Sequence, residues 1–231
     1  MKADAVGIIV AAGSGKRMGG VSKPLIKLGK ETLYEHVLAA FAASSVERIV
    51  AVCSKDNIER ISELSEGKTG KTITVVYGGE TRSESVYLGV KAAGDCELVC
   101  VHDCARPFVT AEMIDGVISS AREVGAATAC TQVTDTVKFV DNEHGVIYTP
   151  ARKYLLSVQT PQCFKKSDYL PAFLRGAFDK KEFTDESAML ENYGVKVAYV
   201  DCGRSNMKLT TKEDIMLAKA IKFLNDRSNE K

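Results

Sequence analysis

The chain has no excess of charge of either sign. Its 231 residues include 31 lysines and arginines and 30 aspartates and glutamates, so the formal net charge is +1 at pH 7. Proteins that bind nucleic acids through the phosphate backbone carry an excess of basic residues. The charge balance therefore excludes a general polyanion binder, and we expect no nucleic-acid partner.

Long apolar runs are also missing. A membrane-spanning helix needs about 20 predominantly apolar residues in a row, and no stretch of this sequence approaches that length. The short apolar stretch after Asp4 runs into glycines and lacks the cleavage end of a signal peptide. We therefore expect no association with a membrane.

A third absence is the paired cysteine framework of small secreted proteins. The seven cysteines are odd in number, mostly embedded in apolar runs, and contain no Cys-x-x-Cys pair; they stand at positions 53, 96, 100, 104, 130, 163 and 202. Disulfide scaffolds pair their cysteines evenly, and structural zinc sites use closely spaced pairs. The pattern predicts buried, reduced thiols in a cytoplasmic protein.

What the sequence does contain is a regular alternation of short β-rich runs with helical patterns. We expect strands at residues 6–10, 48–53, 73–77, 98–102 and 126–133, and helices at 32–43, 56–64, 83–93 and 111–124, the last capped by Thr110. Strands that are continuously apolar, set between helices, are typical of a parallel sheet covered on both faces. The fold class predicted is α/β, with a doubly wound, mostly parallel sheet.

One segment breaks this alternation. Residues 136–140 and 146–149 alternate apolar and polar side chains around a polar turn, which predicts a β-hairpin. A hairpin is marginally stable alone, so it should pack either on its own domain or on a second subunit. After it we expect strands at 157–164 and 195–201, helices at 167–176 and 185–193, and a last helix starting with the capping box Thr210-Thr211-Lys212-Glu213.

The loops that follow the strands are the candidate site, because ligands of open α/β sheets bind beyond the carboxyl ends of the strands. The first strand is followed by Ala11-Ala12-Gly13-Ser14-Gly15-Lys16-Arg17-Met18-Gly19-Gly20 and then Ser22-Lys23-Pro24. Small residues and free amides can cradle phosphate oxygens, and the basic side chains supply positive charge. The loop matches neither the Walker A pattern nor the dinucleotide fingerprint. We interpret it as a phosphate-binding loop of another kind.

Two further loops follow the third and fourth strands. Gly78-Gly79-Glu80-Thr81-Arg82-Ser83-Glu84-Ser85 combines two glycines with a helix N-terminus, which suits a close approach to a base or ribose. In His102-Asp103-Cys104-Ala105-Arg106-Pro107, Asp103 could meet a metal ion or a hydroxyl and Arg106 an anion. The alternative is an Asp103–Arg106 pair that stabilises the turn. We interpret His102 as a packed strand-end histidine.

No Ser/His/Asp or Cys/His arrangement in these loops indicates covalent catalysis. A set of basic groups and backbone amides instead suits phosphoryl or nucleotidyl transfer, in which positioning and charge neutralisation provide most of the catalysis.

Specific motifs extend this interpretation to a family. Ala11-Ala12-Gly13-x-Gly15-x-Arg17-Met18, with Lys23 after it, resembles the signature loop of nucleotidylyltransferases acting on sugar and polyol phosphates. The match is narrowed by Gly78-Gly79-Glu80-x-Arg82-x-x-Ser85-Val86, Val101-His102-Asp103-x-Ala105-Arg106-Pro107, Thr160-Pro161-Gln162 and Thr184-Asp185-Glu186. Over nearly its whole length the chain thus resembles the 2-C-methyl-D-erythritol 4-phosphate cytidylyltransferases of the non-mevalonate isoprenoid pathway.

This resemblance implies a single Rossmann-like nucleotidyltransferase domain over residues 1–231, with a protruding β-hairpin arm at about 134–152. It implies CTP and methylerythritol phosphate as substrates, diphosphate and a CDP-alcohol as products, and Mg²⁺ as cofactor. In the family the arm clasps a partner subunit, which implies a homodimer.

The resemblance also implies roles for individual residues. The catalytic basic residues would be Arg17, Lys23 and Lys208. The nucleotide would be bound by Ala11, Ala12, Gly13, Gly15, Gly79, Glu80 and Ser85. The polyol phosphate would be contacted by Asp103, Arg106, Thr136, Arg152, Thr160 and Thr184. Asp103 is also the candidate metal ligand, and Thr136 and Arg152 would serve the neighbouring subunit's site.

The mechanism expected is direct in-line attack of the acceptor's phosphate on the α-phosphorus of CTP. A phosphate monoester is largely ionised at neutral pH, so no general base is needed. Two alternatives stay open: a cytidylyltransferase for ribitol 5-phosphate, and a nucleotide-binding regulator without catalysis. Against the regulator stand Arg17, Lys23 and Lys208, because a sensor needs no charge directed at a transition state.

Overall fold

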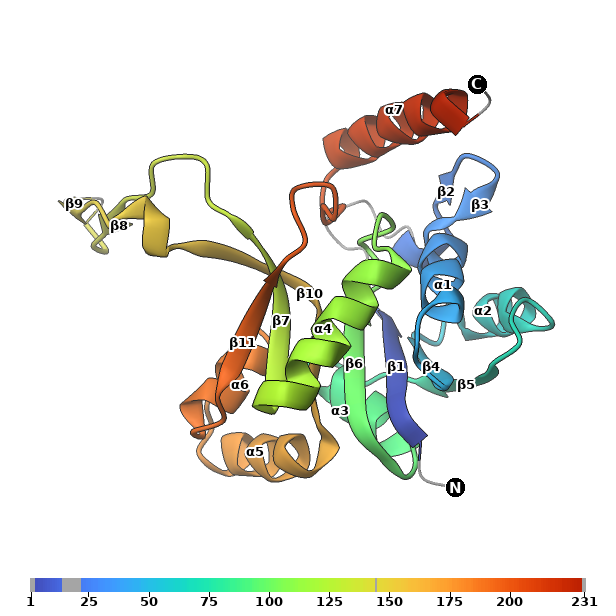
Figure 1. The fold of residues 1–231 in the computed structure, drawn as a ribbon, viewed down its shortest axis with the longest axis horizontal. Coiled ribbons are helices and arrows are strands. Elements are labelled where there is room, and N and C mark those ends of the chain that lie inside the picture. The colour runs from blue at the N-terminus through green and yellow to red at the C-terminus, as the bar shows by residue number, and fades with distance from the viewer. Residues whose placement is uncertain (1–2, 14–21, 144, 230–231) are drawn as a thin grey trace.

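The computed structural model describes residues 3–13, 22–143 and 145–229. In this part of the chain the centre is a seven-stranded sheet with the order β11-β7-β10-β6-β1-β4-β5 (Figure 1). Its strands are β1 (Ala3–Ala11), β4 (Arg48–Cys53), β5 (Thr72–Tyr77), β6 (Cys96–Asp103), β7 (Ala126–Gln132), β10 (Leu156–Lys165) and β11 (Val197–Asp201). Only β10 among these strands runs antiparallel to its neighbours β6 and β7. The predicted mostly parallel sheet is confirmed.

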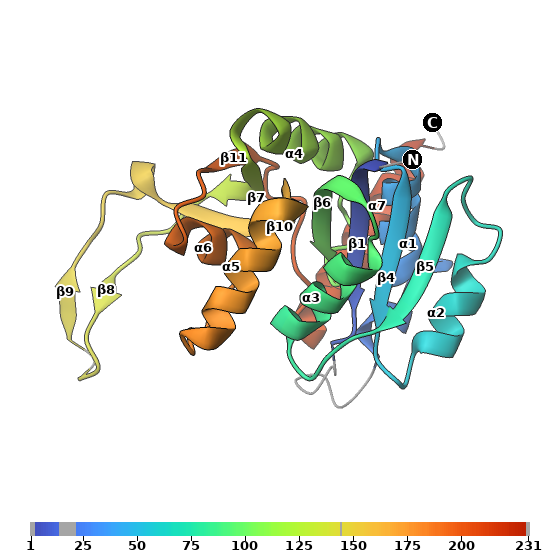
Figure 2. The same ribbon diagram turned by 90° about the horizontal axis from the view of Figure 1, so that it is seen from below.

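Helices cover both faces of the sheet (Figure 2). Neighbouring strand residues point to opposite faces, and Ile8 and Ile9 accordingly belong to two different core clusters. The cluster around Ile9 is completed by α1 (Leu33–Ala43), α2 (Ile58–Ser65) and α4 (Ala111–Val124). The cluster around Ile8 is completed by α3 (Arg82–Ala92), α5 (Lys166–Phe178) and α6 (Glu186–Asn192). This arrangement confirms the doubly wound α/β class.

Two glycines allow helices α1 and α3 to pack directly against the sheet. A Cβ atom on Gly7 of β1 would lie 2.4 Å from Cδ1 of Phe41 in α1. A Cβ atom on Gly89 of α3 would lie 2.8 Å from side-chain methyl groups of both Ile8 and Val52. The close packing of α3 on β1 and β4 fixes the position of the first turn of α3 relative to the sheet. This turn lies at the carboxyl edge of the sheet.

Helix caps agree with the sequence in most places. Thr32 and Thr81 form capping boxes with Glu35 and Glu84, and Thr110 caps α4 as predicted. The box predicted at the start of α7 (Lys212–Asn229) is wrong by one residue.

The box at α7 is formed by Thr211 and Asp214, not by Thr210 and Glu213. The Thr211 hydroxyl accepts from the Asp214 amide at 3.2 Å, and the Asp214 carboxylate accepts from the Thr211 amide at 2.8 Å. The same carboxylate also accepts from the amide and hydroxyl of Thr210. Both adjacent threonines fit the sequence pattern, and the hydrogen bond from the Asp214 amide to the Thr211 hydroxyl identifies Thr211 as the capping residue.

Small elements complete the chain. The predicted hairpin is present as two short antiparallel strands, β8 (Phe139–Val140) and β9 (Val146–Tyr148), which stand away from the rest of the molecule in both ribbon views (Figure 1, Figure 2). Not predicted were β2 (Lys27–Leu28), β3 (Glu31–Thr32) and the 3₁₀ turns η2 (Lys23–Leu25) and η3 (Arg152–Tyr154). Elements of two or three residues are too short to produce a periodic pattern.

All seven cysteines are free and buried, as expected of reduced thiols. Within the described residues, no helix combines the length and the apolar character that crossing a membrane requires.

Candidate active site

A cavity of about 350 Å³ opens at the carboxyl edge of the sheet. The strand order reverses at β1, because the chain adds β4 and β5 on one side and then returns to place β6 on the other. Ligands of open α/β sheets bind at such a reversal point. The cavity is lined by Val10, Ala11, Ala12, Gly13, Lys23, Pro24, Gly79, Glu80, Thr81, Arg82, Ser85, Asp103, Cys104, Ala105 and Lys208.

The end of β1 forms one wall of this cavity. The buried Asn57 side chain donates to the carbonyl of Ala11 at 3.0 Å and to the hydroxyl of Ser22 at 3.1 Å, which ties both ends of the first loop together. A Cβ atom on Gly13 would meet nothing within 4 Å. The backbone at Gly13 therefore borders open space in which a ligand can lie. Gly15 and Arg17, expected in the same loop, lie outside the described residues.

The opposite wall comes from the loop between β5 and α3. A Cβ atom on Gly78 would lie 2.6 Å from the Cβ of Ala12, and one on Gly79 would lie 2.4 Å from the Cβ of Glu84. The packing of this loop on the chain itself thus requires both glycines. The close approach of a base or ribose to this loop stays a prediction. The Ser85 hydroxyl accepts from the Gly79 amide at 3.1 Å and donates to the Thr81 carbonyl at 2.8 Å. Ser85 therefore shapes the loop that borders the cavity.

Two lysines from distant parts of the sequence line the cavity. Lys23 Nζ donates to the carbonyl of Leu209 at 3.3 Å, and Lys208 Nζ donates to Asp103 Oδ2 at 2.6 Å. The Leu209 amide donates to the Ala105 carbonyl at 2.8 Å, which fastens this late segment to the end of β6. The fold thereby brings two cations, predicted from separate motifs, to one cavity.

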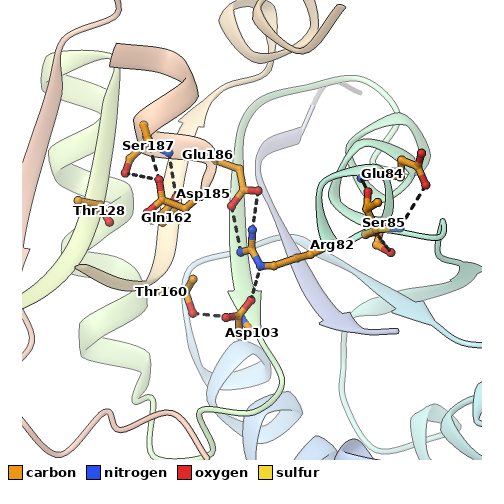
Figure 3. Close-up of polar contacts among 12 residues, drawn as sticks. Arg82, Glu84, Ser85, Asp103, Thr128, Thr160, Gln162, Asp185, Glu186 and Ser187 are labelled. Atoms are coloured by element: carbon orange, nitrogen blue, oxygen red, sulfur yellow. Dashed lines mark hydrogen bonds and ion pairs between the residues drawn. The ribbon is translucent and has the colours of Figure 1, made fainter. Parts of the chain in front are cut away.

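Asp103, the last residue of β6, lies at the centre of a network of charges. Figure 3 shows the Arg82 side chain extended between Asp103 and Glu186. Arg82 Nε donates to Asp103 Oδ1 at 2.9 Å, while its two terminal nitrogens donate to the Glu186 carboxylate at 2.8 and 3.0 Å. With Lys208 on its other oxygen, Asp103 accepts from two cations at once.

These contacts determine the ionisation of the network. Burial would raise the pKa of Asp103, but the charges of Arg82 and then Lys208 outweigh burial and hold that pKa well below its usual range. Burial would likewise lower the pKa of Arg82, and the charges of Glu186 and Asp103 instead raise it. Asp103 is therefore an anion throughout the physiological pH range, and it holds Lys208 beside the cavity.

His102 precedes Asp103 and is fully buried. Its Nε2 faces the carbonyl of Arg106 at 3.1 Å, and a carbonyl can only accept, so Nε2 carries the proton. Nδ1 then accepts from the Thr160 hydroxyl at 3.1 Å, and the same hydroxyl accepts from the Asp103 amide at 3.1 Å. Burial lowers the pKa of His102 to about 4. A neutral, packed histidine agrees with the interpretation made from the sequence.

Arg106 does not form the expected side-chain pair with Asp103. Its guanidinium donates to the backbone carbonyl of Asn206 at 2.8 Å. Asp103 is instead engaged by Arg82, and only the Arg106 amide reaches back, donating to the Asp103 carbonyl at 3.0 Å. The alternative of a turn-stabilising Asp103–Arg106 ion pair is therefore wrong.

Comparisons with known proteins give the site a context. The sequence profile of the family described as 2-C-methyl-D-erythritol 4-phosphate cytidylyltransferase matches residues 5–223. The chain belongs to this family. A member from Clostridium botulinum (strain Langeland / NCTC 10281 / Type F) is 39% identical over 218 residues, which cover 93% of this chain and 95% of the relative. One from Clostridium perfringens (strain SM101 / Type A) is 36% identical over 216 residues, covering 92% and 96%.

Solved structures of cytidylyltransferases agree with this assignment. The crystal structure of 4-diphosphocytidyl-2C-methyl-D-erythritol synthase from Anaerococcus prevotii DSM 20548 is 34% identical, with a TM-score of 0.87 over 94% of this chain and 95% of that one. The 2-C-methyl-D-erythritol 4-phosphate cytidylyltransferase from Thermus thermophilus is 28% identical, with a TM-score of 0.76 over 96% and 99%. This chain therefore shares its fold with both of these structures over nearly their full length.

The cytidine contacts implied by the cytidylyltransferase resemblance lie together in the structure. All those within the described residues line the 350 Å³ cavity: Ala11, Ala12, Gly13, Gly79, Glu80 and Ser85. Lys23, Lys208 and Asp103 line the same cavity. The structure thus brings the predicted nucleotide residues and the predicted catalytic lysines to one place.

The residues expected to contact the polyol phosphate are dispersed, and apart from Asp103 none of them lines that cavity. Thr160 is buried behind Asp103, and Arg106 points toward Asn206. Thr184 borders a second, smaller cavity of about 40 Å³ on the other side of Arg82. Thr136 and Arg152 are exposed residues of the segment that carries the hairpin, where Arg152 donates to the carbonyl of Thr134.

The residues that the structure describes could hold a magnesium ion together with nucleotide phosphates, and not by themselves. Among the described residues no group of three or more His, Cys, Asp or Glu side chains could hold a metal ion. Asp103 lines the cavity, but its oxygens already accept from Arg82 and Lys208. Mg²⁺ is commonly held by one or two carboxylates plus substrate phosphates. Asp103 can therefore supply one ligand, with the triphosphate supplying the others.

Sequence reasoning missed Arg82 and Glu186. Both stand in the motifs that carry the family resemblance, yet neither was assigned a role. They are the first residues of α3 and α6, 104 positions apart, and no periodic or spacing signal connects them. The available signal was a charged residue in the first turn of each of two helices that adjoin candidate motifs.

Proposed function

We propose that the protein transfers the cytidylyl group of CTP to 2-C-methyl-D-erythritol 4-phosphate, with release of diphosphate, as a step of isoprenoid biosynthesis. The observation that carries the proposal is a single cavity, at the reversal point of the sheet, lined by the family's nucleotide residues and two lysines. Seven free, buried thiols support our assigning the enzyme to the reducing cytoplasm.

In this proposal the cytidine lies between the end of β1 and the β5–α3 loop. The open space at Gly13 and the backbone around Gly79 border it. Ser85 keeps that loop in shape through its two hydrogen bonds. The triphosphate then extends toward Lys23 and Lys208, with Arg17 as a further cation from the first loop.

The chemical step is an in-line displacement at the α-phosphorus. An oxygen of the acceptor's phosphate forms a bond to this phosphorus, and the bond to the bridging oxygen of the β-phosphate breaks. The electron pair leaves on diphosphate, so no proton has to be moved. The positive charges of Lys23, Lys208 and Arg17 offset the charge that develops on the transferring and departing groups.

Magnesium belongs to this proposal as a companion of the triphosphate. When bound, it supplies charge neutralisation and orientation of the phosphates. Asp103 is the proposed protein ligand because it ends β6 at the cavity and is ionised.

We further propose a homodimer in which the arm, residues 134–152, serves the neighbouring subunit. The exposed apolar side chains of β8 and β9 support this proposal, since Phe139, Val140, Val146, Ile147 and Tyr148 are each more than half exposed. Such a surface marks a contact with another protein. Thr136 and Arg152 would then reach the acceptor's phosphate in the partner's site.

The proposal is tested by measuring diphosphate release from CTP with methylerythritol phosphate, with ribitol 5-phosphate, and with no acceptor. We expect release with methylerythritol phosphate, little with ribitol 5-phosphate, and none without acceptor. Release should stop when a chelator removes magnesium and return when it is restored. Preference for ribitol 5-phosphate would overturn the substrate assignment, and no release with either acceptor would support a non-catalytic regulator.

A further inference from the structure

Glu186 is a buried charge with no place in the mechanism above. Its side chain is only 4% exposed, and it borders the small 40 Å³ cavity without lining the large one. Burying a carboxylate is costly unless it is paired and hydrogen-bonded. Apolar residues of similar size could replace a salt bridge whose only role is stability. The buried carboxylate of Glu186 beside the cavity therefore suggests a role other than stability.

Arg82 is the side chain that pairs with Glu186, and the pair is bidentate. A guanidinium is a rigid planar fork, so two parallel bonds to one carboxylate fix its plane as well as its position. The remaining donor, Nε, then points at Asp103 Oδ1 at 2.9 Å. Glu186 thereby determines the direction from which Arg82 meets Asp103.

Glu186 itself is held by a network that reaches into the sheet (Figure 3). Asp185 caps α6 by accepting from the Ala188 amide at 2.8 Å. Gln162 of β10 donates to Asp185 at 3.1 Å and accepts from the Ser187 amide at 3.0 Å. The first turn of α6 is therefore fastened to β10, which pairs with β6, the strand that carries Asp103.

The contact between Arg82 and Asp103 determines which oxygen of Asp103 is available to Lys208. With Oδ1 of Asp103 taken by Arg82, Oδ2 is the oxygen that receives Lys208, at 2.6 Å. Burial raises the pKa of Glu186, and the charge of Arg82 opposes this effect. With Glu186 ionised, the cluster of Arg82, Lys208, Asp103 and Glu186 carries two positive and two negative charges and is neutral as a unit. Loss of one member unbalances it and frees Asp103 to turn.

We propose that Arg82 and Glu186 are positioning residues for the cytidylyl transfer: Glu186 orients Arg82, and Arg82 fixes Asp103 so that Lys208 faces the nucleotide cavity. This inference rests on the proposed function for its activity readouts. Because Glu186 lies outside the large cavity, its effect on the reaction is transmitted through Arg82 and Asp103.

Three variants separate positioning from stability. Glu186→Gln keeps the shape of the side chain but loses the bidentate pair and leaves Arg82 unbalanced. Arg82→Gln leaves Glu186 unpaired. The double variant Arg82→Gln/Glu186→Gln removes both charges and keeps hydrogen-bonding amides, so it should fold with a melting temperature near that of the wild type. Arg60→Gln/Glu63→Gln, which removes an exposed ion pair of α2, is the matched control.

We expect Glu186→Gln to lower kcat/KM for the acceptor about 10–100-fold, by analogy with the loss of partners that orient metal ligands, while the dissociation constant for CTP stays within about threefold. The double variant should regain stability without regaining transfer, and its kcat/KM should equal that of Arg82→Gln. A double variant with wild-type transfer would overturn the proposal, because the pair would then be merely structural. Losses that multiply in the double variant would also overturn it, since Glu186 would then act without Arg82.

A second readout does not depend on the substrate. In crystal structures of the variants, the Asp103 side chain should lose its 2.6 Å contact with Lys208 in the double variant and keep it in the Arg60/Glu63 control. An unchanged Asp103–Lys208 contact would show that Arg82 does not hold Asp103, whatever the activity. If the wild type transfers nothing to methylerythritol phosphate, the proposed function fails, and these structures still decide whether Arg82 positions Asp103.

Discussion

The net charge of the chain is close to zero, so the indication of its function comes from the charged residues at the cavity. Lys23, Lys208, Arg82 and Asp103 line the cavity, and Glu186 beside it pairs with Arg82. The net charge of +1 excludes a general polyanion binder but does not exclude one triphosphate. At the scale of residues, the position of a few basic side chains at the cavity indicates the ligand, whereas the net charge of the chain does not.

Lys23→Ala should lower kcat by about 10²–10³, by analogy with the loss of one preorganised donor to a developing charge. The substitution also removes the hydrogen bond to the Leu209 carbonyl, so a thermal melt must accompany the steady-state measurement of diphosphate release. Lys27→Ala removes an exposed lysine of β2 and serves as the control. Near-normal turnover of Lys23→Ala would remove Lys23 from the mechanism.

His102 should make stability depend on pH. Its pKa is 6.5 in the unfolded chain and about 4 in the fold, so between these values only the unfolded state binds the proton. Stability contributed by neutral His102 is therefore complete above pH 6.5 and is lost as pH falls toward 4, by about 3 kcal/mol in total. Urea unfolding from pH 7.5 to 4.5 should show a flatter dependence for His102→Asn than for the wild type. Equal slopes would contradict the buried neutral histidine.

At the scale of elements, the close contact of α3 with the sheet positions the β5–α3 loop. Gly89 lies in the middle of α3 where no Cβ fits, because Ile8 and Val52 lie too close. Gly116 lies in the middle of α4, where a Cβ would be 3.7 Å from Val200, an ordinary contact. The two glycines share a helical setting and differ in the space around them.

Replacing each glycine by alanine should therefore have opposite effects on the free energy of unfolding. Gly116→Ala should stabilise the protein by about 0.5–1 kcal/mol, because alanine loses less conformational entropy in a helix. Gly89→Ala should destabilise it by about 1–3 kcal/mol through overpacking. Chemical denaturation of both variants measures the difference. A stabilised Gly89→Ala would mean that α3 can move away from the sheet at little cost.

Long elements with a periodic apolar pattern were predictable from the sequence. Two-residue strands, and a helix cap for which two neighbouring residues fit the pattern, were not. The strand β4 and the helix α4 have the predicted bounds, since their apolar patterns end at clear turn residues. The strands β2 and β3 give no pattern because each has two residues. The cap of α7 was misplaced because both neighbouring threonines fit the pattern, and only the structure shows that the Thr211 hydroxyl accepts from the Asp214 amide.

The candidate site was predictable where its residues follow strands directly. Gly13, Gly79 and Asp103 lie at the ends of β1, β5 and β6, and parallel strands bring these positions to one edge. The Arg82–Glu186 pair depends on the contact between the first turns of α3 and α6, which no local pattern encodes. Tertiary contacts between charged residues far apart in sequence are the part that required the structure.

At the scale of the whole molecule, the exposed hairpin of β8 and β9 allows the proposed homodimer to be tested. If Arg152 serves the neighbouring site, a protomer carrying Lys23→Ala and one carrying Arg152→Ala can together form one intact site. Each variant alone should be nearly inactive with the acceptor at low concentration. Mixing them after dissociation and reassociation should restore about one quarter of wild-type activity, because half of the dimers are mixed and each has one intact site. No recovery, although mixed dimers form, would assign Arg152 to its own subunit.

The transfer of label from CTP tests the central claim most directly. With CTP labelled at the α-phosphorus, methylerythritol phosphate and magnesium, the label should appear in the CDP-alcohol, one for each diphosphate released. With CTP labelled at the γ-phosphorus, the label should leave entirely in diphosphate. Label from the γ-phosphorus in the acceptor, or no transfer of the α-label at all, would contradict a cytidylyl transfer at this cavity.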